Sequence, residues 1–79
     1  MSRYFFHLHD REGTLLDREG KDFRDMFAAR SYAVLMARSV MSADVESGIF
    51  DQNGFMEVVD EKGKTTLTVQ FAEAVLRVV

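Results

Sequence analysis

Apolar and polar residues alternate near the start of the chain, from residue 3 to residue 9. Such alternation predicts a β-strand with one buried and one exposed face. The buried face is expected to carry Tyr4, Phe6 and Leu8, and the other face Phe5, His7 and His9. Residues 14 to 16 follow closely enough to form the hairpin partner of this strand.

A second pair of strands is predicted near the end of the chain, over residues 55 to 60 and 64 to 71. In the last strand, one side is formed by Thr65, Leu67, Val69 and Phe71, and the other by Thr66, Thr68 and Gln70. One face of the sheet is therefore expected to be polar.

Four segments of the form Asp-x-x-Gly separate the predicted elements, at residues 10 to 13, 17 to 20, 51 to 54 and 60 to 63. The aspartate side chain bonds the backbone two residues on, and the glycine adopts the left-handed conformation that closes the turn. Each segment predicts a tight turn, and none resembles a linker between domains.

The middle of the chain, from about residue 26 to residue 47, is predicted to be one long helix with Asp25 as N-cap and Gly48 at its C-terminal end. Its apolar stripe consists of Met26, Ala29, Ala33, Met36, Ala37 and Val40. Such a helix is about 33 Å long, whereas a seven-residue strand is about 23 Å long. We expect the helix to overhang its sheet, to kink or to meet another subunit.

These elements predict an α+β protein of two layers, in which antiparallel β-hairpins flank one long α-helix in the order β-β-α-β-β. Residues 1–79 are expected to form a single small α/β domain. The predicted core consists of Tyr4, Phe6, Leu8, Leu16, Met26, Ala29, Ala33, Met36, Ala37, Val40, Leu67, Val69 and Phe71.

Composition narrows the function classes. The chain has no cysteine, which excludes disulfides and cysteine-ligated zinc, and its net charge of −3 argues against a nucleic-acid partner. We find no secretory signal and no apolar run long enough for a membrane span. A cytoplasmic location is therefore expected, without a membrane partner.

Two histidines are the only candidates for metal chemistry. His7 and His9 lie two apart on a predicted strand and therefore share a face, a spacing that can chelate a transition metal. A third ligand would have to come from Asp10, Asp17 or a distant carboxylate, and nothing in the spacing requires one. We therefore predict solvated or packed histidines, no metal, no cofactor and no catalytic residue, with metal binding or acid–base chemistry at His7 and His9 as alternatives.

Large apolar residues are left outside the predicted core. They are Phe5 on the histidine face, Leu35 on the polar side of the helix, and Val75, Leu76, Val78 and Val79 at the C-terminal end. Small monomers seldom expose so many large apolar groups. We predict that these residues form the interface of a homo-oligomer, for which a twofold dimer is the commonest arrangement.

The chain also resembles a known family. The similarity lies in the opening Arg3-Tyr4-Phe5-Phe6-His7-Leu8, the spaced Gly13, Asp17 and Gly20, the helix start Ala28-Ala29-Arg30, and the closing Leu67-Thr68-Val69-Gln70-Phe71-Ala72-Glu73-Ala74. These motifs are typical of short bacterial proteins known only as a domain of unknown function. Members often carry proline where this chain has Gln70, so its last strand is expected to end differently. The resemblance implies no activity, cofactor or catalytic residue.

A weaker likeness, at the level of fold alone, is to small antitoxin-like proteins of the β-β-(β)-α-β type. The leading hypothesis is a non-catalytic interaction or regulatory module that acts as a homo-oligomer, with an unidentified protein as a further partner. An antitoxin-like or nucleic-acid-associated regulator is the alternative, and an enzyme or metal protein is the third.

Overall fold

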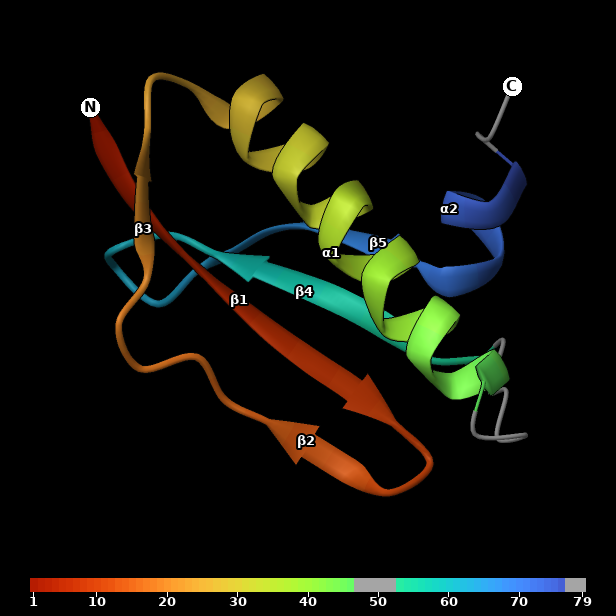
Figure 1. Ribbon diagram of the computed structural model, residues 1–79. Helices are drawn as coiled ribbons and strands as arrows, with labels where there is room; N and C mark the ends of the chain where they lie inside the picture. The colour runs from red at the N-terminus through yellow and green to blue at the C-terminus, as the bar shows by residue number, and fades with distance from the viewer. Residues whose placement is uncertain (47–52, 77–79) are drawn as a thin grey trace.

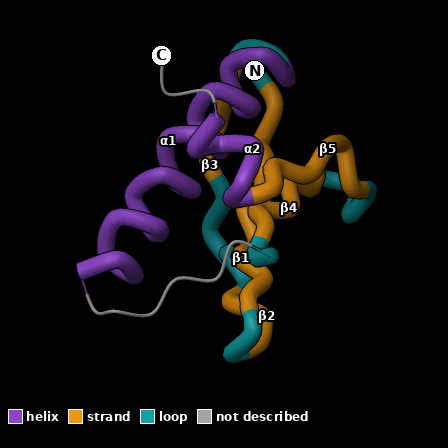
Figure 2. The backbone as a smooth tube through the Cα atoms, turned by 90° about the vertical axis from the view of Figure 1, so that its right-hand side faces the viewer, coloured by secondary structure: helices purple, strands orange, loops and turns teal. Residues whose placement is uncertain are grey.

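The computed structural model describes residues 1–46 and 53–76, with side chains for residues 1–42 and 53–74 (Figure 1). Its elements in chain order are β1 (Ser2–Asp10), β2 (Gly13–Leu15), β3 (Lys21–Phe23), α1 (Met26–Glu46), β4 (Phe55–Val59), β5 (Thr65–Gln70) and α2 (Phe71–Leu76). Both helices lie on one side of an antiparallel sheet, as the view in Figure 2 shows. The predicted α+β architecture is confirmed.

Strand β1 is the centre of the sheet, whose order is β2-β1-β4-β5. One edge of β1 pairs with β4 over Phe5 to His9. The other edge is shared, because β2 pairs with its C-terminal part and β3 with its N-terminal part. All of these pairings are antiparallel. The nine residues of β1 therefore pair with three other strands.

Strand β3 was not predicted, because three residues of mixed polarity give no strand signal. Strand β3 forms because the N-terminal part of β1 has an edge that no other strand covers. The Arg3 guanidinium holds β3 in place by donating to Asp22 Oδ1 at 3.0 Å and to the Glu19 carbonyl at 2.9 Å. Its last residue, Phe23, adds a ring to an aromatic cluster in which the Phe6 and Tyr32 centroids lie 5.0 Å apart. The short strand thus extends the core.

The turn chemistry is confirmed at three of the four Asp-x-x-Gly segments. Gly13, Gly20 and Gly63 have φ of 126°, 73° and 82°. The aspartates at their starts accept backbone hydrogen bonds, for example from Lys62 N to Asp60 Oδ1 at 2.9 Å. The fourth segment begins outside the described residues.

Helix α1 begins where the sequence predicts, since Asp25 Oδ1 accepts a hydrogen bond from Ala28 N at 2.9 Å, which is the N-cap geometry. Gly48 lies outside the described residues. The buried side of α1 is lined by Ala29, Ala33 and Ala37, none of which is exposed. Because alanine is short, the helix packs closely over β4 and β5.

The last strand ends earlier than predicted. Phe71 is the first residue of α2 and not the end of β5, and its N–H donates to the Gly54 carbonyl at 3.0 Å. Glu73 reaches back to Gln70 N at 3.4 Å, the reciprocal half of a capping box. A bulge beside Val58 also turns Thr65 to the outer face of the sheet, opposite to the side predicted for it.

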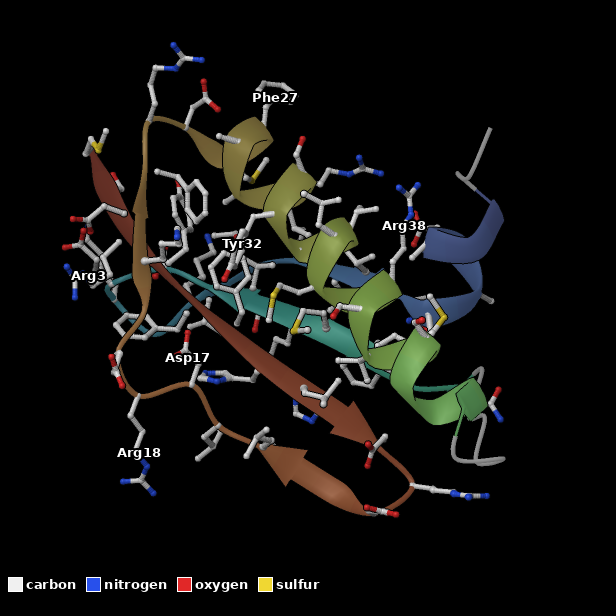
Figure 3. The ribbon with its side chains drawn as sticks, in the orientation of Figure 1. Arg3, Asp17, Arg18, Phe27, Tyr32 and Arg38 are labelled. Atoms are coloured by element: carbon white, nitrogen blue, oxygen red, sulfur yellow. The ribbon has the colours of Figure 1, made fainter. Side chains whose placement is uncertain are left out.

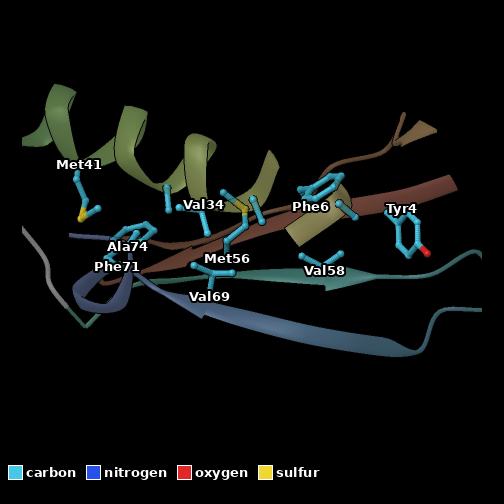
Figure 4. Packing of buried hydrophobic residues seen from close by; sticks show 12 residues of the cluster. Tyr4, Phe6, Val34, Met41, Met56, Val58, Val69, Phe71 and Ala74 are labelled. Carbon is cyan, nitrogen blue, oxygen red and sulfur yellow. The ribbon is translucent and has the colours of Figure 1, made fainter. Parts of the chain in front are cut away.

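The core confirms the predicted register of β1, since Tyr4 and Phe6 are both buried (Figure 4). Seven predicted core residues are buried: Tyr4, Phe6, Ala29, Ala33, Ala37, Val69 and Phe71. Three pack partly buried against them: Leu8, Val40 and Leu67. Buried residues missing from the prediction are Val34, Met41, Met56, Val58, Val59 and Ala74.

Three core predictions are wrong. Leu16, Met26 and Met36 are exposed to 53%, 41% and 37%. For Leu16 and Met36 the reason is the position of α1, which packs over β4 and β5 and leaves the inner face of the β1–β2 hairpin uncovered. Leucine and methionine beside that uncovered face therefore lack a packing partner. Met26 is the first residue of α1 and lies at the end of the helix.

Gly54 provides a test of the packing between β4 and α2. A Cβ at this position would lie 2.6 Å from Cε2 of the fully buried Phe71, which has no room to move. We expect Gly54→Ala to lower the free energy of unfolding by about 2–3 kcal/mol in urea titrations. The control is Gly63→Ala, where a Cβ meets nothing within 4 Å and only the left-handed backbone costs about 1 kcal/mol. Equal losses would contradict this packing.

Candidate functional site

His9 lies on the outer face of the sheet, which the helices do not cover. Its imidazole is part of a polar network on that face. His9 Nδ1 lies 2.9 Å from Thr14 Oγ1, and His9 Nε2 lies 2.8 Å from Glu57 Oε1. The ring stacks on Phe55, with centroids 4.6 Å apart. Both ring nitrogens are therefore engaged and the ring is held in place.

Glu57 joins this network through its second oxygen, which accepts a hydrogen bond from the Thr65 hydroxyl. The Thr65 hydroxyl, and after it the His9 ring, lower the pKa of Glu57 below its ordinary value. Glu57 is a cross-strand neighbour of His7, so its carboxylate lies on the face that the sequence predicts the two histidines to share.

The second histidine is tied to the loop between β2 and β3. The Asp17 N–H donates to His7 Nδ1 at 3.1 Å, while the Asp17 carboxylate accepts from Phe6 N, Glu19 N and Gly20 N, each at 3.1 Å. Partial burial raises the pKa of Asp17, but these three hydrogen bonds and the nearby imidazole outweigh it and the pKa is lowered. From the sequence, Asp17 was expected to begin a turn and was one of the carboxylates that could have joined the histidines at a metal site, but its link to the β1 backbone was not foreseen.

A hydroxyl, an imidazole and a carboxylate in a row are the parts of a nucleophilic triad. In this protein the row of Thr14, His9 and Glu57 lies on the outer face of the sheet, where the His9 and Glu57 side chains are about a quarter exposed. Within the described part of the chain, no three histidine, aspartate or glutamate side chains converge in a way that could hold a metal ion. The network fixes the β1, β2, β4 and β5 strands to one another.

The predicted interface residues lie in different places. Phe5 is half-buried, because its ring lies against Gly20. Leu35 is 61% exposed on the outer side of α1. Val75 and Leu76 end α2 and their side chains are outside the described set, as are Val78 and Val79 altogether.

An exposed aromatic residue was missed by the sequence reasoning. Phe27 is 77% exposed and points away from the sheet near the start of α1 (Figure 3). Phe27, Ser31 and Leu35 are spaced four residues apart and therefore follow one line along the helix. We call this line the α1 ridge. The spacing itself was the signal that could have identified it.

A groove lies between α1 and the uncovered hairpin, on a different side of α1 from the ridge. Leu8, Leu15 and Leu16 line one wall, and Tyr32, Met36 and Val40 of α1 line the other. Its volume is about 560 Å³. The groove and the α1 ridge are thus two distinct apolar surfaces, whereas the histidine face is a polar network.

Comparison with known proteins gives one match. Residues 3–72 match the family model described as a domain of unknown function, DUF6894. No curated protein and no solved structure matches the chain. Neither helix, over the described residues, is long and apolar enough to span a bilayer. The family match agrees with the resemblance found in the sequence.

The role of Asp17 can be tested through stability. We expect Asp17→Asn to lower the free energy of unfolding by about 1–2 kcal/mol at pH 7, because a charged acceptor of three backbone hydrogen bonds is replaced by a neutral one. The folded pKa of Asp17 is lowered, so its stabilisation is complete above the unfolded pKa of about 3.9 and is lost as pH falls through the folded pKa. Urea titrations should show a constant difference from pH 5 to 7 that shrinks below about pH 4. A difference unchanged at pH 3 would contradict the assignment.

The histidines are predicted to bind no metal tightly. Calorimetric titration of the purified protein with zinc or nickel should show weak binding at most, because both His9 nitrogens and His7 Nδ1 already have partners. A stoichiometric site with sub-micromolar affinity that disappears in His7→Ala would reverse this prediction.

Proposed function

The chain belongs to the family DUF6894, a domain of unknown function, and from its exposed surfaces we propose that it is a non-catalytic interaction module that acts as a homodimer. The observation that carries the proposal is the α1 ridge. Phe27 and Leu35 are the large apolar side chains of this ridge, exposed to 77% and 61%. Leaving both in water is unfavourable by about 1.5–3 kcal/mol each relative to burial.

The ridge is complementary to itself. When two copies of α1 pack antiparallel about a twofold axis at Ser31, Phe27 of one copy meets Leu35 of the other. The small Ser31 side chain at the axis allows the helices to approach to about 8–10 Å. One contact therefore covers both exposed residues on both copies.

The charges beside the ridge permit this contact. Arg38 is turned towards α2, where its Nε donates to the Ala74 carbonyl at 3.2 Å (Figure 3). Arg24 lies near Asp25, with Nε 3.8 Å from Oδ2. Between Phe27 and Leu35 the ridge itself carries only Ser31, so no charge has to be buried.

The predicted interface fits this surface in part. Leu35 lies on the ridge, and α2, which ends with Val75 and Leu76, packs beside α1 in the same layer. Phe5 lies on the opposite side of the sheet and would serve a different contact. An acidic chain without cysteine also suits the reducing cytosol, where we propose that the protein acts.

A non-catalytic role is supported by the histidine face. The groups that could act in catalysis bind one another across four strands, and the His9 ring is stacked on Phe55. Such a network stabilises the sheet. We therefore assign the protein's action to its apolar surfaces and not to its histidines.

Light scattering on the purified protein tests the dimer. We expect a mass near twice the 9.0 kDa of one chain at high micromolar concentration, with dissociation on dilution. Leu35→Ser and Phe27→Ser should each raise the dissociation constant at least about tenfold, since each removes one contact twice in the twofold pair.

The matched control is Leu16→Ser, which removes a leucine that is 53% exposed in the groove and not on the ridge. It should leave the dissociation constant unchanged. A stable mass of 9.0 kDa throughout the micromolar range would refute the homodimer.

A further inference from the structure

The groove between α1 and the β1–β2 hairpin is a hollow of about 560 Å³ outside the histidine face. Its apolar lining comes from Leu8, Leu15 and Leu16 on the hairpin side and from Met36 and Val40 on the helix side. It arises because α1 packs over β4 and β5 and not over the hairpin. The α1 ridge contributes nothing to it, so homodimerisation through the ridge leaves it open.

The hairpin wall of the groove faces solvent. Leu15 is 69% exposed and Leu16 is 53% exposed, whereas drug-sized ligands are typically buried to about 70–90% in their sites. A hollow of about 560 Å³ with so exposed a wall suits one side of a larger occupant. The occupant is therefore a segment of a macromolecule.

The floor of the groove favours a helical segment. It consists of side chains from the inner face of the β1–β2 pair and from α1, so an occupant that lies on this floor meets side chains and not the edge of a strand. An occupant in this position must satisfy its own backbone, which a helix does and an extended peptide does not. Helices bind such grooves through apolar side chains at positions i, i+3, i+4 and i+7.

The charged residues around the groove indicate which charge the bound helical segment should carry beside its apolar side. Asp17 and Glu19 line one end, and an adjoining hollow of about 330 Å³ towards the hairpin tip is lined by Asp10 and Glu12. Lys21 is the single cation that lines these two hollows in the described chain, and its Nζ lies 5.2 Å from the centroid of the Tyr32 ring. The rim is therefore strongly acidic.

The neighbouring arginines do not cancel this charge. Arg18 belongs to the same loop as Asp17 but points away from the groove (Figure 3). Arg11, at the hairpin tip, lines a separate hollow beside His9 and Phe55. Asp17 itself keeps its negative charge although its oxygens accept hydrogen bonds, because those bonds favour the ionised form.

We propose that this groove binds an amphipathic, basic helix of a partner protein. The apolar side of the helix covers Leu8, Leu15 and Leu16, and its lysines and arginines face the carboxylates at both ends of the groove. This goes beyond the proposed homodimer, because the groove and the α1 ridge share no residue. One surface can then join two copies while the other binds a different chain.

A designed peptide can test the proposal. The probe is an 18-residue helix of leucine and lysine at amphipathic spacing, with one tryptophan on its apolar side. Since the protein contains no tryptophan, the fluorescence reports the peptide alone. We expect saturable binding with a dissociation constant of about 10–100 μM that weakens as salt is added. The same peptide with glutamate in place of lysine should bind at least about tenfold more weakly.

Two sets of variants locate the site. Leu15→Ser with Leu16→Ser removes apolar lining that is already exposed, so the fold survives and peptide affinity should fall at least about tenfold. Glu12→Gln with Glu19→Gln should weaken binding severalfold. Its matched control is Thr68→Lys with Gln70→Lys on the outer face of β5, which changes the net charge equally and should leave binding within about twofold.

The outcomes separate this proposal from the homodimer. Leu35→Ser should weaken self-association while leaving peptide affinity unchanged, since Leu35 lies outside the groove. The proposal is overturned if the glutamate peptide binds as tightly as the lysine peptide. It is equally overturned if the double leucine variant retains its circular dichroism spectrum and its full affinity.

Discussion

The hydrogen bonding of β1 is the constraint on which the rest of this small fold depends. This strand of nine residues pairs with β4 along one edge and with both β2 and β3 along the other. Between β2 and β3 the chain leaves that edge, and the Phe6 N–H would lose its partner. The Asp17 carboxylate replaces the missing strand by accepting from Phe6 N. An unpaired buried N–H costs about 1–3 kcal/mol, a large share of the stability of such a chain.

Local sequence signals predicted the parts of the fold that local chemistry determines. The Asp25 cap and the glycines at positions 13, 20 and 63 act within a few residues of themselves, and all were found as predicted. Strand β3 could not be predicted in this way, because only the free edge of β1, far away in sequence, makes it a strand. Helix α2 did carry a signal, Glu73 three residues after Gln70, but the alternation of β5 masked it.

The exposed apolar surfaces show a second limit of sequence reasoning. Alternation tells which side of a strand is apolar, but not which strands the helix will cover. Leu16 and Met36 were therefore assigned to the core, although α1 packs over β4 and β5 and leaves them in the groove. Leu35 was identified because it interrupts a polar helix face. Phe27 was overlooked because its four-residue spacing to Leu35 runs through the polar Ser31, which hides the line in a search for consecutive apolar positions.

The row of alanines under α1 acts as a spacer of fixed thickness between the two layers. Ala29, Ala33 and Ala37 are each fully buried, so the helix can come no closer and is held at the distance that a methyl group sets. A larger side chain at Ala33 would lift the middle of α1 and tilt it about its ends. The groove wall and the α1 ridge belong to this same rigid rod, so one interior methyl group sets the width of one surface and the orientation of the other. A natural substitution at one of these alanines would therefore change the width of the groove and the orientation of the α1 ridge together, without changing any residue exposed on either surface.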